Sequence, residues 1–167
     1  MGCDIHMYVE KRLSKSDAWQ LDENHAINED GYLEQVTATG RNYILFGLMA
    51  EVRGNDYLYS ARGTPNDISD LLRVESEGPD NHSNSWLTLD EFKNALYIAK
   101  YDLTANKSCD AFYEYNNYPG GWNSMPEDYT TIVNYCEQWV ANELAEAMLL
   151  NRTDIEPEVR LIFWFDN

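Results

Sequence analysis

The first residues of the chain carry acid–base and metal-binding side chains at every second position. Asp4 and His6 alternate with apolar residues in the stretch 3–12, a period of two that predicts a β-strand. A carboxylate and an imidazole two positions apart on a strand point to the same side and can share a metal ion or a proton. An ordinary solvated strand face has the same spacing, so this pair alone leaves both interpretations open.

A second polar cluster lies at 80–86, with the sequence Asp-Asn-His-Ser-Asn-Ser-Trp. We expect a loop over 75–85, in which Ser85 and Trp86 bind a ligand. If the protein is an enzyme, His82 and Asp80 are its catalytic candidates. Alternatively, these side chains only satisfy neighbouring backbone amides in a turn.

The last residues of the chain supply a third group of candidate site residues. Residues 159–165 are apolar on both faces of a predicted strand, which is typical of a central strand, and Asp166 follows on the same face as Arg160. If the first and last strands are neighbours, Asp4, His6 and Asp166 would converge with His82, and these four residues would then bind a ligand together. The first three would then be ligands for Mg²⁺ or Mn²⁺.

Four arginines stand out because cations are scarce in this chain: Arg41, Arg53, Arg62 and Arg160. We take Arg41 and Arg160 as candidates for binding the anionic group of a ligand. The alternative is that all four offset neighbouring acids.

The elements that must position these groups point to an α+β fold. We expect a small, mostly antiparallel sheet that contains both termini, with three or four helices packed on it. A short strand near 18–20 forms a hairpin with the first strand. The β-branched and aromatic residues at the end of the chain form a further strand. The predicted helices are 41–53 stopped by Gly54, a short one that begins at Pro65, 88–100 opened by a Thr88/Glu91 capping box, and 126–150. We treat 1–167 as one domain with a Tyr/Asn/Gly-rich excursion at 101–125.

Composition limits the function. The 167 residues carry 29 acidic and 12 basic side chains, a net charge of −17, which argues against direct binding to nucleic acid or to an anionic membrane. No apolar run is long enough to span a bilayer, and the N-terminus lacks the pattern of a secretory signal. The three cysteines, Cys3, Cys109 and Cys136, form no CxxC pair, which indicates a reducing, cytoplasmic compartment. We expect Cys3 and Cys136 to be core thiols.

The acidity is uneven. Residues 108–151 contain seven acids, many aromatics and no Lys, Arg or His. Such a surface can imitate a phosphate backbone and bind a basic groove, or can simply keep the protein soluble. The partner surface that we expect there consists of Asp110, Tyr113, Glu114, Tyr115, Glu127 and Asp128.

Four segments together, one of which is Arg41-x-Tyr43-x-Leu45-Phe46, resemble a family of uncharacterised phage and prophage proteins. These open with M-G-C-D-I-H, as residues 1–6 do, and end in a V-R-x-x-F-W-F-D-N strand, as residues 159–167 do; Asp80-x-His82-Ser83-x-Ser85-Trp86 lies between. The resemblance implies a phage or mobile-element origin and no settled activity. Position 81 is Asn where the family pattern suggests Gly.

We expect a phage-type acidic protein that acts by binding. It would be a counter-defence or host-takeover inhibitor that neutralises a host or defence-system protein or sequesters a nucleotide-like ligand. One alternative is a metal-dependent phosphoester hydrolase that uses Asp4, His6, Asp80, His82 and Asp166. The other is a DNA mimic that blocks a nuclease through 108–151. The sequence contains no Walker A, GxSxG or HExxH motif.

Overall fold

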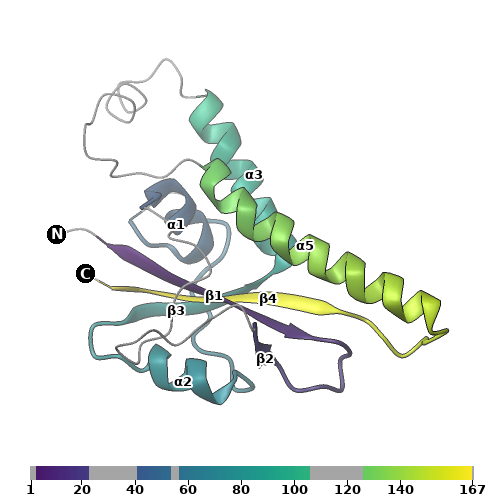
Figure 1. The fold of residues 1–167 in the computed structure, drawn as a ribbon. Helices are drawn as coiled ribbons and strands as arrows, with labels where there is room; N and C mark the ends of the chain where they lie inside the picture. Colours follow the sequence, from purple (N-terminus) through teal and green to yellow (C-terminus); the bar gives the residue numbers. More distant parts are fainter. Residues whose placement is uncertain (1–2, 23–40, 54–56, 106–125, 167) are drawn as a thin grey trace, which may run out of the picture.

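One antiparallel sheet organises the protein (Figure 1). The computed structural model describes residues 3–22, 41–53, 57–105 and 126–166. Within them the strand order is β2-β1-β4-β3. The strands are β1 (Asp4–Arg12), β2 (Gln20–Leu21), β3 (His82–Thr88) and β4 (Glu158–Asp166), and the helices are α1 (Tyr43–Ala50), α2 (Asp70–Ser76), α3 (Leu89–Ala105) and α5 (Pro126–Leu149). The predicted α+β fold, with both terminal strands in the sheet, is confirmed.

The last strand lies in the interior of the sheet, as its sequence predicts. β4 pairs with β1 along its whole length, from Asp4 opposite Asp166 to Arg12 opposite Glu158, and with β3 on its other edge. Side chains on both faces of this central strand are buried by neighbouring elements. This burial explains why β4 is apolar on both of its faces. The hairpin is also confirmed, with β2 at Gln20–Leu21.

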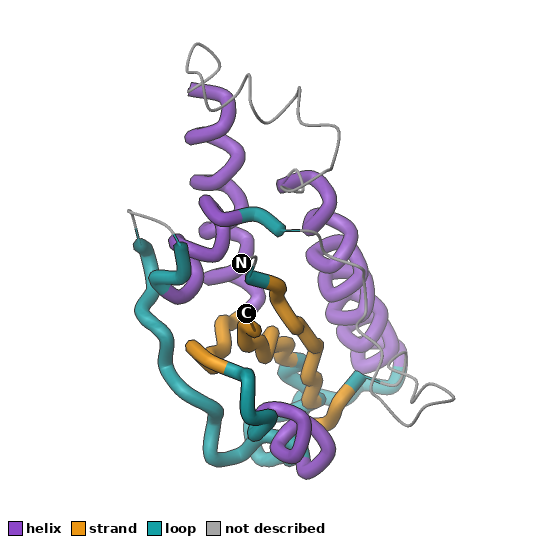
Figure 2. Tube along the Cα trace, turned by 90° about the vertical axis from the view of Figure 1, so that its left-hand side faces the viewer, coloured by secondary structure: helices purple, strands orange, loops and turns teal. Residues whose placement is uncertain are grey.

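Helices cover both faces of the sheet (Figure 2). α1, α3 and α5 pack on one face, which we call the three-helix face, where Met7, Leu161 and Phe163 enter the larger core. α2 lies against the other face, which we call the α2 face, where Tyr8, Ile162, Trp164 and residues of the α2 region form a smaller core. Each strand of the central pair therefore contributes alternate residues to two separate cores.

Local signals begin α1 and α3 close to where the sequence predicts them. The capping box before α3 is present: the Thr88 hydroxyl accepts from the Glu91 amide at 3.2 Å, and the Glu91 carboxylate accepts from the Thr88 amide at 3.0 Å. Asn42 caps α1 in the same manner by accepting from the Leu45 amide. α1 ends earlier than predicted, because Glu51 adopts a left-handed conformation (φ 61°).

Two predicted elements were wrong. The loop expected over 75–85 contains the start of β3, which pairs with β4 from His82 onward across a bulge centred on Ser83 (φ 53°). The short helix begins at Asp70, not at Pro65. Pairing with β4 draws the polar residues of 82–85 into a strand. Pro65 belongs to a turn, closed by the Ile68 amide donating to the Pro65 carbonyl at 3.3 Å, and α2 starts after this turn.

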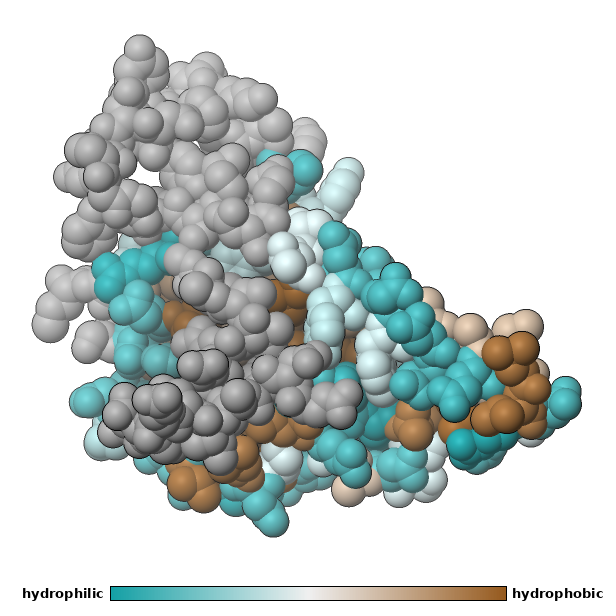
Figure 3. Space-filling model, in the orientation of Figure 1, coloured by the Kyte–Doolittle hydropathy of each residue, from teal (hydrophilic) through white to brown (hydrophobic). Residues whose placement is uncertain are grey.

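α5 is the longest described helix, and the hydropathy of its surface changes along its length. Figure 3 shows polar side chains along much of the helix and apolar ones gathered at its far end. None of the described helices combines the length and apolar character needed to cross a membrane.

Candidate functional site

The polar ends of β1 and β4 meet at one corner of the α2 face. Asp4 lies directly opposite Asp166 in the register of the two strands. The His6 imidazole makes a 3.0 Å contact from Nε2 to Oδ2 of Asp166 and stacks on Trp164, with ring centroids 6.0 Å apart. The structure thus brings Asp4, His6 and Asp166 to one neighbourhood.

An arginine forms an ion pair with the carboxylate of Asp4. Arg41 donates to both of its oxygens, at 2.6 and 2.9 Å. This bidentate pairing lowers the pKa of Asp4 below its ordinary value. Across the described parts of the chain, no three His, Cys, Asp or Glu side chains are grouped as ligands for a metal ion. The expected metal site at Asp4, His6 and Asp166 is therefore not assembled.

The predicted convergence of His82 with His6 was wrong. His82 lies opposite Phe165 in the register, contacts the Cys3 sulfur at 3.9 Å and stacks on the Phe165 ring. His6 stacks on the adjacent residue, Trp164. Because consecutive side chains of β4 point to opposite faces, the two histidines lie on opposite sides of the sheet. The five residues proposed for a hydrolase do not form one site, and Asp80 is exposed in the turn before β3.

The predicted anion pocket was also wrong in its geometry. Asp4, which holds Arg41, and Glu10, which holds Arg160, are six residues apart on β1, or about 20 Å along a strand. Ser85 is buried, and its hydroxyl accepts from the Arg62 backbone amide at 3.1 Å. These residues therefore do not line one pocket.

For three of the four arginines the structure supports the alternative interpretation, in which they offset neighbouring acids. Arg41, Arg62 and Arg160 each pair with a carboxylate, from Asp4, Glu91 and Glu10 respectively.

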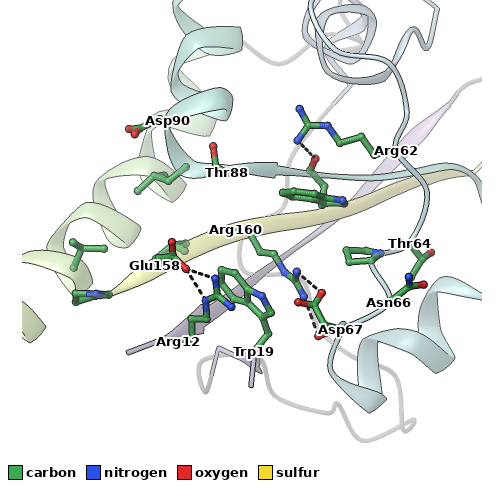
Figure 4. A pocket seen from close by; sticks show the side chains of 16 residues that line it. Arg12, Trp19, Arg62, Thr64, Asn66, Asp67, Thr88, Asp90, Glu158 and Arg160 are labelled. Atoms are coloured by element: carbon green, nitrogen blue, oxygen red, sulfur yellow. Dashed lines mark hydrogen bonds and ion pairs between the residues drawn. The ribbon is translucent and has the colours of Figure 1, made fainter. Parts of the chain in front are cut away.

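A large open groove lies along the α2 face, where the end of the sheet opposite Asp4 meets residues 62–67 and the start of α3 (Figure 4). Its volume is about 980 Å³. Two residues predicted to bind a ligand, Trp86 and Arg160, line it. The other lining residues are Arg12, Trp19, Arg62, Thr64, Pro65, Asn66, Asp67, Thr88, Leu89, Asp90, Val140, Pro157, Glu158 and Val159.

Guanidinium groups hold both tryptophans of the groove. The Cζ atoms of Arg12 and Arg160 lie 4.3 and 4.2 Å from the Trp19 ring centroid, and that of Arg62 lies 4.8 Å from the Trp86 ring centroid. These are cation–π distances. A guanidinium that stacks on an indole in this way fixes the orientation of the ring and keeps its own N–H groups for hydrogen bonds. The groove consequently presents two pre-positioned indoles.

Carboxylates in turn hold the guanidiniums. Arg62 donates to both oxygens of Glu91 at 2.8 and 2.6 Å, and this lowers the pKa of Glu91. Arg160 donates to Asp67 at 2.8 Å and lowers the pKa of that carboxyl as well.

The lining of the groove contains as many arginines as carboxylates, three of each. Two further carboxylates pair with Arg160 and Arg62 from outside the lining, so five carboxylates surround the three arginines. The carboxylates are Glu10, Asp67, Asp90, Glu91 and Glu158.

Sequence reasoning missed most of this groove. The sequence pattern places Trp19 only in a short strand and gives Asp67 no role. A usable signal is present, since Arg12 and Trp19 belong to the two arms of the predicted hairpin, and residues on opposite arms of a hairpin lie close together. The segment 62–67 gave no such signal, because its position depends on contacts with distant strands.

The two described cysteines are core thiols, as predicted. Cys3 and Cys136 are free and fully buried. Burial raises the pKa of the Cys3 thiol and raises that of Cys136 to about 12. Neither is in the thiolate form that a nucleophile requires. Cys109 lies outside the described residues.

Most of the predicted acidic partner surface lies outside the described residues, namely Asp110, Tyr113, Glu114 and Tyr115. Glu127 and Asp128 belong to the first turn of α5. The DNA-mimic interpretation remains a hypothesis.

Comparison of the chain with protein-family models, with curated proteins and with solved structures gives no match in any of the three.

Proposed function

We propose that this protein acts by binding, as a stoichiometric inhibitor of a host or defence-system protein, and that the groove holds a basic segment of that partner. The observation that carries the proposal is the pair of indoles, Trp19 and Trp86, fixed by three guanidiniums along an open groove. The phage or mobile-element origin that the resemblance implies fits a stoichiometric inhibitor, because phage genomes favour compact proteins of this kind.

The side chains of the groove are those that dominate protein–protein binding energy. Tryptophan and arginine are enriched at interface hot spots, where a small number of large side chains account for most of the affinity. Trp19 and Trp86 are already positioned by their cation–π neighbours, so binding costs them little additional rotamer entropy. A volume of about 980 Å³ accommodates several side chains of a partner segment.

The charges of the groove favour a basic segment over a phosphate-bearing ligand. Arg62 and Arg160 already donate to carboxylates, so a nucleotide would have to displace Glu91 or Asp67 to reach them. A lysine or arginine of a partner meets exposed acids instead, because the Asp67 side chain is 62% exposed and Asp90 is exposed on the rim. The net charge of −17 adds long-range attraction for a basic partner.

An affinity pulldown from bacterial lysate with matched variants tests the proposal. Trp86→Ala removes one indole, and Asp90→Lys reverses a rim charge. Asp70→Lys is the control, because Asp70 is also a first-turn acid of a helix but does not line the groove. We expect a partner that the wild type and Asp70→Lys retain in near-equimolar amount and that Trp86→Ala and Asp90→Lys lose. Circular dichroism checks that each variant is folded.

Two results would overturn the proposal. One is equal retention of the partner by folded Trp86→Ala and by the wild type, which would place binding elsewhere. The other is a nucleotide released from the purified protein by heat and absent from Trp86→Ala, which mass spectrometry would detect. That result would make the groove a small-molecule site instead.

A further inference from the structure

The groove has two chemically different ends, which lie on either side of Trp19 and Arg160. Figure 4 shows Asp67 on one side of these two residues and Glu158 on the other. We name the ends by the side chains that line them. The polar end consists of Thr64, Asn66 and Asp67, and the apolar end consists of Leu89, Val140, Pro157 and Val159.

Asp67, at the polar end, is a carboxylate that is held in place and still accessible. Arg160 donates to its Oδ1 from Nη1 at 2.8 Å and to its backbone carbonyl from Nη2 at 3.1 Å. The hydrogen bond from Arg160 lowers the pKa of Asp67, which keeps the carboxyl ionised at neutral pH. The side chain is nevertheless 62% exposed, and a carboxylate can accept about four hydrogen bonds, so a second cationic donor can reach it.

The apolar end is formed by three elements at the margin of the larger core. Leu89 begins α3, Val140 belongs to α5, and Pro157 directly precedes β4. All three are half-buried, and they line the groove. An aliphatic side chain placed there would remove their remaining apolar surface from water. The acid beside them, Glu158, already accepts from Arg12 at 2.6 Å, which leaves apolar contact as the main interaction that this end offers.

β4 sets the separation between the two ends. Pro157 and Arg160 are three residues apart, or about 10 Å along a strand, and Asp67 lies beyond Arg160, at the tip of its guanidinium. In an extended partner chain every second side chain points the same way. Side chains two positions apart are then about 7 Å apart, and those four positions apart are about 13 Å apart. The longer of these two spacings matches the separation of the ends.

We infer that the groove recognises an extended segment in which a lysine or arginine and an aliphatic residue are four positions apart. The inference rests on the proposed function and names the kind of segment that the groove holds. The basic residue pairs with Asp67, the aliphatic residue enters the apolar end, and the side chain midway between them contacts the indoles of Trp19 and Trp86. Asp90, on the rim, keeps the approach to the groove negative.

Designed peptides with different spacings test the inference. Each probe has about nine residues, with one arginine and one leucine in a serine and threonine background, and is titrated into the full-length protein by calorimetry. We expect one-to-one binding of the peptide with the four-position spacing. A peptide of the same composition with the two-position spacing should bind roughly fivefold more weakly or worse, because it reaches only one end at a time.

Paired changes in the protein and the peptide locate each contact. Asp67→Asn should weaken binding roughly fivefold, and should have no effect on a peptide whose arginine is replaced by glutamine. Val140→Thr should weaken binding about threefold to fivefold, and should have no effect on a peptide whose leucine is replaced by serine. Asp70→Asn and Val74→Thr are the matched controls, because both residues are exposed on α2 and do not line the groove. They should bind as the wild type does.

Three results would overturn the inference. The first is equal affinity for the two spacings. The second is loss of binding in Asp67→Asn or Val140→Thr that is the same for the original and the substituted peptides. The third is tighter binding of a helical peptide with the two residues seven positions apart, about 10 Å along a helix, which would replace the extended segment by a helix. If no peptide binds but the lysate pulldown yields a partner that Trp86→Ala loses, the proposed function is retained and only this inference fails.

Discussion

Arg160 and Glu10 form an ion pair that is buried on both sides, between the two central strands. They lie opposite each other in the register of β1 and β4, and Arg160 donates to Oε2 of Glu10 from Nε at 2.8 Å. Their side chains are 4% and 0% exposed. Glu10 also accepts from the Ser69 amide, and Arg160 stacks on Trp19. One buried pair thus ties the sheet both to the start of α2 and to an indole of the groove.

Removal of one partner from this pair should lower the stability of the folded protein considerably. Arg160→Met leaves the Glu10 carboxylate buried without its cation, which costs about 3–5 kcal/mol of the free energy of unfolding. Urea unfolding followed by circular dichroism measures the loss. The double variant Arg160→Met/Glu10→Gln should lose less than the sum of the two single variants, because it leaves no buried charge. Additive losses would contradict the pairing.

The period-two patterns predicted the sheet because they record burial on each side of a strand. β1 and β4 are long and regular, and their apolar residues identified both the strands and the central position of β4. β3 could not be predicted in this way. Its first residues, His82 to Ser85, are small and polar, and they become a strand only because β4 offers an unpaired edge, with Ser83 taking up a bulge.

The candidate site was only partly predictable, for the same reason. The sequence indicated that Asp4, His6 and Asp166 share a corner, since that follows from pairing two recognised strands. It did not indicate that His82 lies on the opposite face, because the face of a residue depends on register, and β3 had no predicted register. Trp86 and Arg160 were chosen for their chemistry, and the groove that joins them depends on long-range packing of residues 62–67.

The buried thiols should resist alkylation in the folded protein. The pKa of Cys136 is raised to about 12 and that of Cys3 is also raised, in both cases mainly by burial, so almost no thiolate exists near pH 8. We expect iodoacetamide to modify neither residue before unfolding and both after it. Peptide mapping by mass spectrometry measures the extent of alkylation at each cysteine separately. Rapid modification of Cys136 in the native protein would show that this part of α5 opens readily.

The cap of α1 should contribute measurable stability. Asn42 is 2% exposed, and its side-chain oxygen accepts from the Leu45 amide at 2.9 Å. Asn42→Ala removes that acceptor and should cost about 1 kcal/mol in urea unfolding. Asn42→Ser keeps an oxygen at the cap and should cost less. An equal loss in the two variants would mean that packing, and not capping, is the role of Asn42.

The pair between Asp4 and Arg41 should make part of the stability depend on acid pH. The folded-state pKa of Asp4 is lowered by its hydrogen bonds from Arg41, so the contribution is present above the unfolded-state pKa of about 3.9 and is lost as the pH falls through the folded value. Urea unfolding should find the wild type more stable than Asp4→Asn near pH 7, by a difference that shrinks as the pH falls below the unfolded-state pKa and disappears once Asp4 is protonated in the folded protein as well. Because the Asp4 side chain is 59% exposed, added NaCl should reduce the difference near pH 7 as well. A difference that is independent of both pH and salt would mean that Asp4→Asn acts through packing and not through charge.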